Sequence, residues 1–70
     1  MQLIVGEKIK ARRKELRMTQ KQLCKETGIS QPYLSRVERD IFMPSVKQLY
    51  LIAATLQVKI DDLIETKADQ

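Results

Sequence analysis

The feature that most constrains this chain is a pair of short helical patterns that meet at one glycine, in the stretch TQKQLCKETGISQPYLSRVER at residues 19–39. Thr19 and Ser30 are residue types that cap helix N-termini, because their hydroxyls accept hydrogen bonds from backbone N–H groups that have no helical partner. Gln22 is placed to complete a capping box with Thr19. Gly28 readily takes the left-handed conformation that ends a helix. The predicted helices span residues 20–27 and 31–39.

Apolar residues also recur at helical spacing in the rest of the chain, and no stretch alternates as a strand would. We expect three further helices, over residues 4–16, 46–56 and 60–65. The positions of the first two that are expected to face the core are Val5, Ile9, Leu16, Val46, Leu49, Ile52, Ala53 and Leu56. The prediction is an all-α, compact five-helix domain over residues 1–66, followed by a polar tail at 67–70.

The composition argues against an enzyme. The chain has no histidine, its single cysteine is Cys24, and its two glycines are Gly6 and Gly28. These counts exclude a Cys-His or Ser-His nucleophilic pair, a zinc site and a glycine-rich phosphate loop within the chain. We therefore expect no catalytic residue, no metal and no cofactor.

An unpaired cysteine and the absence of a visible secretory signal favour a reducing, cytoplasmic location. The longest apolar run, residues 49–56, is far shorter than the roughly 20 residues that span a bilayer, so no membrane partner is expected.

Basic charge is concentrated in one part of the chain. The net charge is +4, but residues 1–39 hold ten Lys/Arg against four Asp/Glu, and residues 40–70 hold three against five. The first part is therefore suited to a polyanionic partner. The alternative is a solvated basic surface with no such partner, since these are common.

The second helix of the opening stretch is short and polar, and only Leu34 and Val37 are strongly apolar residues that face inward. Helix, tight turn and helix form the helix-turn-helix arrangement, whose second helix enters the major groove of DNA. That groove, about 12 Å wide, admits one α-helix. The outer face of the second helix would present Gln31, Tyr33, Ser35 and Arg36.

The chain resembles the helix-turn-helix family of phage repressors and Cro proteins, the Xre-like transcriptional regulators. The resemblance rests on Thr19-Gln20, Gly28-Ile29-Ser30, Glu38, Pro44 and the Leu-x-x-Ile-Ala-x-x-Leu pattern of residues 49–56, and it covers residues 5–64. It implies a lambda-repressor-like fold and a sequence-specific repressor that binds an inverted repeat in double-stranded DNA as a homodimer. A phage or mobile-element repressor, a restriction-modification controller and an antitoxin all fit this description.

The resemblance also implies roles for individual residues. The base-reading positions of the family are occupied here by Gln31, Pro32, Tyr33 and Arg36. Because an amide pairs with adenine and a guanidinium with guanine, Gln31 and above all Arg36 are the expected specificity residues. For Arg36 the alternative is a phosphate contact or a surface salt bridge. For Gln31 it is a solvent-exposed helix start, and for Tyr33 it is a hydrogen bond to a phosphate. The expected phosphate contacts are Gln20, Ser30, Ser35, Arg17, Lys21 and Arg39, and for Ser30 the alternative is helix capping alone.

Two further positions have structural roles in the family. Arg13 and Glu38 match a pair that forms an internal ion pair between the first and third helices. Cys24 stands where the family usually has alanine at a helix crossing, so a packed thiol is expected, with redox sensing as the alternative.

The chain departs from the family pattern directly after the third helix, where Asp40, Ile41, Phe42 and Met43 replace the usual glycine and basic or polar residues. Asp40 can still adopt the left-handed conformation, at some cost. Either Ile41 and one neighbour close the core, or Ile41-Phe42-Met43 form an exposed patch that contacts a protein partner or a DNA groove. The exposed patch is the basis of an alternative function, a protein-interaction adaptor of the same fold.

A homodimer would need an apolar surface within the domain itself. The candidates lie in and after the fourth helix, and simple core packing is the alternative for each of them. They are Tyr50, Leu51, Val58 and Ile64.

Overall fold

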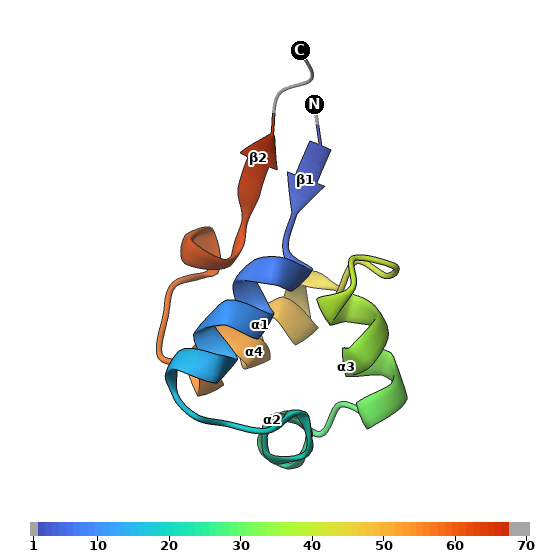
Figure 1. Cartoon of the computed structure of the whole chain (residues 1–70), viewed down its shortest axis with the longest axis vertical. Helices are drawn as coiled ribbons and strands as arrows, with labels where there is room; N and C mark the ends of the chain where they lie inside the picture. The colour runs from blue at the N-terminus through green and yellow to red at the C-terminus, as the bar shows by residue number, and fades with distance from the viewer. Residues whose placement is uncertain (1, 68–70) are drawn as a thin grey trace.

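Four α-helices make up most of the computed structural model, which describes residues 2–67 (Figure 1). They are α1 (Gly6–Glu15), α2 (Gln20–Thr27), α3 (Gln31–Glu38) and α4 (Val46–Thr55). A 3₁₀ turn, η1 (Ile60–Leu63), follows α4, and two short strands, β1 (Gln2–Ile4) and β2 (Glu65–Lys67), lie at the two ends of the described chain. The described residues thus form a compact, mostly helical domain with four α-helices.

The helices of the opening stretch begin and end close to the predicted residues. The Thr19 hydroxyl accepts a hydrogen bond from the Gln22 N–H (3.1 Å), and the Gln22 side chain accepts one from the Thr19 N–H (2.8 Å), so the capping box is confirmed. Ser30 caps α3 through the Tyr33 N–H, and Gly28 ends α2 with a φ of 76°. Local capping chemistry therefore sets these boundaries.

The prediction of a fifth helix over 60–65 is wrong. Residues 60–63 form one 3₁₀ turn, and β2 then pairs antiparallel with β1, with Leu3 opposite Thr66 and Ile4 opposite Glu65. Thr66 and Lys67 belong to this ribbon, although residue 67 was assigned to the polar tail; residues 68–70 lie outside the described residues. Strands of three residues are too short to show alternation, and their pairing depends on a partner about 60 residues away in the sequence.

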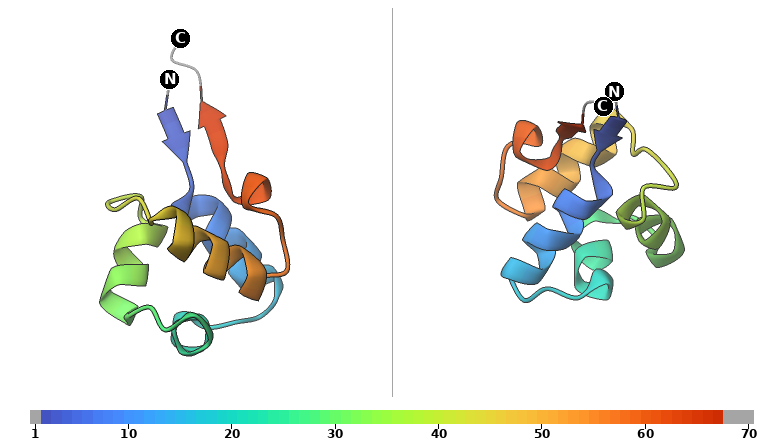
Figure 2. Two further views of the ribbon diagram at one scale, coloured as in Figure 1. Left: turned by 180° about the vertical axis from the view of Figure 1, so that it is seen from behind. Right: turned by 45° about the horizontal axis from the view of Figure 1, so that its top comes forward.

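The core lies between the four helices, and η1 packs against α1 and α4. Figure 1 and the left view of Figure 2 show the ribbon projecting from the helical part, with α2 at the end farthest from it. The fully buried side chains include Val5, Ile9, Leu23, Leu34, Val37, Ile52, Leu56 and Leu63. Within residues 2–67 no helix has both the length and the apolar character needed to cross a membrane.

Two residues expected in the core lie at the surface. Val46 is 79% exposed, because it is the first residue after the Ser45 cap and faces outward in the first turn of α4. Leu16 follows the last residue of α1 and is also exposed. Helical spacing assigned both residues to the inner face, but each lies at a helix end where neighbouring elements no longer cover the chain.

The N-terminus of α1 is capped from the loop between α3 and α4. The Oδ1 atom of Asp40 accepts hydrogen bonds from the N–H groups of Val5 (3.2 Å) and Gly6 (2.9 Å). Asp40 adopts a left-handed conformation with a φ of 58°. Its own N–H donates to the Val37 carbonyl and the Ile41 N–H donates to the Arg36 carbonyl, the hydrogen bonds of a Schellman motif. Asp40 therefore both ends α3 and starts α1.

Gly6 is the point at which α1 approaches the end of α3 most closely. A Cβ atom on Gly6 would lie 2.7 Å from the carbonyl oxygen of Glu38 and closer still to that of Val37. Both are backbone atoms of a helix and cannot rotate aside as a side chain would. This crossing of α1 and α3 therefore requires glycine.

We expect Asp40→Ala to lower the free energy of unfolding by about 1–2 kcal/mol, because it removes the acceptor that caps α1. Asp40→Asn is the matched control, since asparagine can accept the same hydrogen bonds and tolerates the left-handed conformation. Urea denaturation followed by circular dichroism measures both. Equal stability of the two variants would show that the cap contributes nothing.

Gly6→Ala tests the close approach of α1 to α3. Helix propensity alone predicts that alanine stabilises α1 by up to about 1 kcal/mol. We expect strong destabilisation instead, because the added methyl group overlaps backbone atoms. Gly28→Ala is the comparison: a Cβ there meets nothing within 4 Å, so only the left-handed conformation is penalised, by about 1–2 kcal/mol. A thermally stabilised Gly6→Ala variant would contradict the steric argument.

Candidate nucleic-acid interface

One side of α3 is buried and the other is open to solvent. Leu34, Val37 and Glu38 are buried, whereas Gln31, Pro32 and Arg36 are exposed. Tyr33 and Ser35 are half-buried. The structure thus brings three of the four predicted base-reading residues onto the open side of one helix, and α3 itself lies at one side of the molecule (Figure 1).

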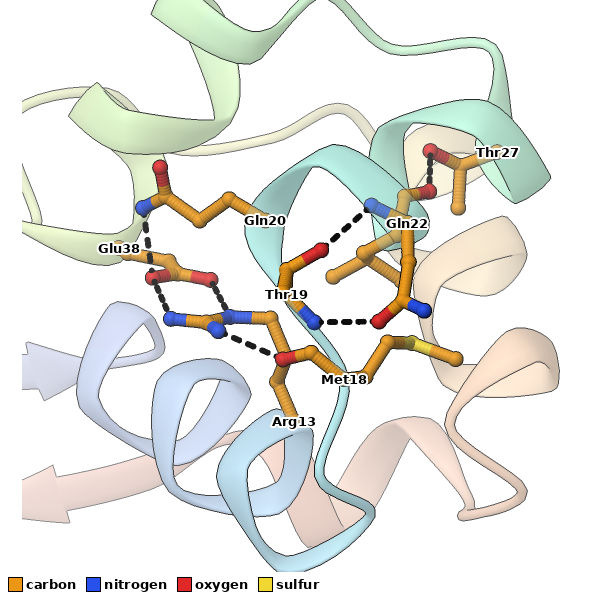
Figure 3. Close-up of polar contacts among 8 residues, drawn as sticks. Arg13, Met18, Thr19, Gln20, Gln22, Thr27 and Glu38 are labelled. Atoms are coloured by element: carbon orange, nitrogen blue, oxygen red, sulfur yellow. Dashed lines mark hydrogen bonds and ion pairs between the residues drawn. The ribbon is translucent and has the colours of Figure 1, made fainter.

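A buried ion pair holds the inner side of α3. The guanidinium of Arg13 donates to both carboxylate oxygens of Glu38, from Nε to Oε2 (2.8 Å) and from Nη2 to Oε1 (3.0 Å), and the two residues are 8% and 4% exposed (Figure 3). Arg13 Nη1 also donates to the Met18 carbonyl (2.7 Å). Arg13 and Glu38 therefore form the ion pair that the resemblance implied. Through it and the Met18 contact, Arg13 links α1 to α3 and to the loop after α1.

Gln20 completes this network. Its side-chain Nε2 donates to Glu38 Oε1 at 3.0 Å, so the side chain expected to meet a phosphate is directed at the ion pair (Figure 3). Its backbone N–H lies in the first turn of α2, where N–H groups have no helical acceptor. Sequence reasoning found Gln20 but did not predict this contact with Glu38.

The residues expected to meet phosphates differ in their surroundings. Arg17 and Lys21 are exposed, near the start of α2. Arg39 is exposed at the end of α3, where its Nε donates to the Ser35 carbonyl (3.3 Å). The Ser30 hydroxyl caps α3. These side chains lie at both ends of α3 and at the start of α2.

The helix-turn-helix family model HTH_3 matches residues 9–63, which include all of α2, α3 and α4. The chain belongs to this family. The family consists of DNA-binding regulators and not of enzymes. In helix-turn-helix terms, α2 and α3 are the two helices of the motif, the turn is at residues 28–30, and α3 is the recognition helix.

Individual relatives agree with this assignment. The immunity repressor protein of Bacillus phage phi105 is 37% identical over 62 residues, which are 89% of this chain and 43% of that repressor. The P22 c2 repressor of a Salmonella phage, solved in complex with synthetic operator 9T, superposes with a TM-score of 0.82 at 36% identity and covers 90% of this chain and 94% of that chain. The chain thus spans less than half the length of the phi105 repressor that it matches.

SinR, a transcriptional regulator of Bacillus subtilis, is a third relative. Its complex with DNA superposes with a TM-score of 0.81 at 33% identity, covering 86% of this chain and 97% of that chain. A complex of SinR with the protein SinI gives the same TM-score and identity over 86% of this chain and 59% of that chain.

The recognition helix has an aromatic neighbour that sequence reasoning placed in a separate patch. Phe42, in the loop after α3, stacks on Tyr33 with ring centroids 5.7 Å apart and an interplanar angle of 27°. The guanidinium carbon of Arg36 lies over the Phe42 ring, 5.6 Å from its centroid. The Tyr33 hydroxyl donates to Gln48 Oε1 at 2.9 Å. Phe42 therefore contacts two predicted base-reading residues.

The interpretation that Ile41 and a neighbour close the core is wrong. Ile41 is 56% exposed, Phe42 42% and Met43 53%, and it is Pro44 that is buried. The Schellman motif at Asp40 turns the chain outward, so the loop crosses the surface and returns only at Pro44. All three apolar residues of the loop are accessible to a partner.

The candidate dimer residues divide between two parts of the surface. Tyr50, 64% exposed, and Val58 line an open groove of about 370 Å³ between α4 and the 3₁₀ turn. Leu51 lines a different hollow, beside Tyr33 and Gln48. Val58 and Ile64 are half-buried and pack against the core.

Cys24 is half-buried against the core. Burial raises the pKa of its thiol, and the nearby Glu38 carboxylate raises that pKa further. Since the thiolate is the reactive form, this environment disfavours redox chemistry and agrees with a packing role. Within residues 2–67, His, Cys, Asp and Glu side chains form no group of three or more that could hold a metal ion.

We expect Arg13→Ala to destabilise the domain by about 3–5 kcal/mol, because it leaves the Glu38 carboxylate buried without its partner. A domain of this size is stable by only about 3–5 kcal/mol, so the variant should be largely unfolded at 25 °C by circular dichroism. Lys8→Ala, which breaks the exposed Lys8–Glu65 pair (3.3 Å), is the control and should cost at most about 1 kcal/mol. An Arg13→Ala variant as stable as Lys8→Ala would refute the role of the ion pair.

Proposed function

We propose that this chain is a sequence-specific DNA-binding domain of a transcriptional regulator, and that it acts as a repressor. The observation that carries the proposal is α3, whose inner side is anchored by Leu34, Val37 and Glu38 and whose outer side offers exposed hydrogen-bonding groups. A helix that is held from one side and polar on the other can enter a major groove without loss of packing. The solved DNA complexes of the P22 c2 repressor and SinR support this proposal.

Direct base readout comes from α3. Gln31 lies at its exposed start and pairs with adenine, and Arg36, about one turn after Pro32 and Tyr33, donates two hydrogen bonds to guanine. Pro32 contacts a thymine methyl group. The Tyr33 hydroxyl is bound to Gln48, so Tyr33 contributes the edge of its ring to the interface.

The phosphate contacts surround this helix. The N-terminus of α2 at Gln20 presents backbone N–H groups, which suit a phosphate oxygen together with the helix dipole. Arg17, Lys21 and Arg39 add positive charge. Ser30 adds a hydroxyl group at the start of α3, and Ser35 adds one near its middle. Each phosphate that is neutralised contributes about −0.9 to the slope of log K against log salt concentration.

A homodimer on an inverted repeat follows from the limited reach of a single helix, which contacts too few base pairs for useful specificity. The groove lined by Tyr50 and Val58 is the apolar surface where a second copy would pack. Leu51, which lines a different hollow, and Ile64 are the other two candidate residues. Phage or mobile-element repressor, restriction-modification controller and antitoxin are the contexts that fit such a domain.

We expect selection from random duplex DNA at about 150 mM salt to recover an inverted repeat with half-sites about one helical turn apart. Arg36→Ala should lower the affinity for that site by about 1–3 kcal/mol and relax one base position in each half-site. Arg39→Ala is the matched control: it should weaken binding to all sequences alike and reduce the salt slope by about 1. Recovery of no preferred sequence by the unmodified chain would refute the proposed function.

A protein-interaction adaptor is the second candidate, and the exposure of Ile41 and Met43 favours it. SinR, solved in complex with SinI, is a relative that binds a protein. For an adaptor, an Ile41→Ser/Met43→Ser variant would lose its partner, whereas Arg36→Ala would keep it. For a DNA reader, Arg36→Ala would weaken DNA binding, whereas Ile41→Ser/Met43→Ser would leave it unchanged.

A further inference from the structure

We propose that Phe42 is a positioning residue for Arg36, and that it sets base specificity by holding the guanidinium in its reading conformation before DNA binds. The inference rests on the proposed function. Its basis is the stack of Tyr33, Phe42 and Arg36, which joins the loop after α3 to the outer side of the recognition helix. Phe42 itself makes no base contact in this proposal and acts through Arg36.

The stack is anchored at α4. Gln48 Oε1 accepts hydrogen bonds from the Ser45 N–H (3.2 Å), as part of the cap of α4, and from the Tyr33 hydroxyl (2.9 Å). The Tyr33 ring is therefore fixed at its outer end by α4 and at its backbone by α3. Phe42 stacks on this fixed ring, which restricts the Phe42 side chain although it lies in a loop.

Arg36 is the mobile part of the arrangement. An exposed arginine loses much of its rotamer freedom when it binds a base, and this loss weakens binding. A cation–π contact with Phe42 restricts the side chain in the free protein, so less freedom is lost on binding. A guanidinium has five N–H donors, more than one contact with a ring can occupy, so donors remain to pair with guanine.

The exposure of the loop supports the same assignment. Phe42 is the least exposed of the three apolar loop residues, at 42% against 56% for Ile41 and 53% for Met43. Its ring contacts two residues of α3, Tyr33 and Arg36. The loop thus has two surfaces: Phe42 belongs to the recognition helix, while Ile41 and Met43 face outward.

The test uses the full chain and the DNA site that it selects from a random pool. Affinities are measured for that site and for sites with single substitutions at each base pair. We expect Phe42→Ala and Phe42→Leu to reduce discrimination about three- to tenfold at the base pair read by Arg36, with the other base pairs and the salt slope unchanged. Phe42→Tyr retains the aromatic face and should keep full discrimination.

Phe42→Leu separates aromatic from apolar packing, since it keeps bulk and loses the π face. A double-mutant cycle completes the test: in an Arg36→Ala background, Phe42→Leu should have no further effect at that base pair. In the free protein, the ring-current shift of the Arg36 side-chain protons should be present in wild type and Phe42→Tyr and absent in Phe42→Leu.

Four results would overturn the inference. The positioning role would be refuted if Phe42→Leu left base discrimination unchanged. It would also be refuted if Phe42→Leu lowered the affinity equally at every base pair and did so in the Arg36→Ala background as well. Either result would leave the proposed function standing. Absence of a ring-current shift in wild type would refute the contact itself. If the wild-type chain selects no sequence, the proposed function fails and this inference fails with it.

Discussion

The contact on which the rest of the structure depends is the buried pair of Arg13 and Glu38. Glu38 is the last residue of α3, where a negative charge is disfavoured by the helix dipole as well as by burial. Arg13 satisfies both carboxylate oxygens, and its remaining Nη1 holds the carbonyl of Met18. Gln20 adds a donor from α2. One carboxylate therefore sets the placement of α1, α2 and α3 relative to one another, including the angle between the two helices of the motif.

Three of the four helices, α1, α3 and α4, end without a glycine in the left-handed position. Arg17, Asp40 and Gln57 all have positive φ, and each occupies the left-handed position of a Schellman motif after α1, α3 and α4. In this left-handed conformation a residue with a Cβ atom destabilises the fold by roughly 1–2 kcal/mol relative to glycine. At Asp40 the cost is offset because the carboxylate caps α1. The stop of one helix and the start of another are thus a single structural unit.

Fewer lysines and arginines are available to contact DNA than their total number in the sequence indicates. Arg13 is buried in its ion pair, Arg12 donates to the carbonyl of Leu56 at the end of α4 (3.0 Å), and Lys8 pairs with Glu65 beside the β-ribbon. These three cations stabilise the fold. The recognition helix and its surroundings retain Arg17, Lys21, Arg36 and Arg39 in exposed positions. In the proposed interface Arg36 reads a base, and Arg17, Lys21 and Arg39 supply the electrostatic attraction.

The local patterns of the sequence determined most of the helical frame and the family. Capping residues at Thr19, Ser30 and Ser45 and the stop at Gly28 act within one turn of chain, so their effect can be read without a fold. Only the tertiary structure decided the β-ribbon, the exposure of Val46, the cap of α1 by Asp40 and the stack of Phe42 on Tyr33 and under Arg36. The ribbon, the exposure of Val46 and the cap of α1 depend on contacts between segments far apart in the sequence. The stack joins nearer residues, but it depends on the path of the loop after α3, which local periodicity does not predict.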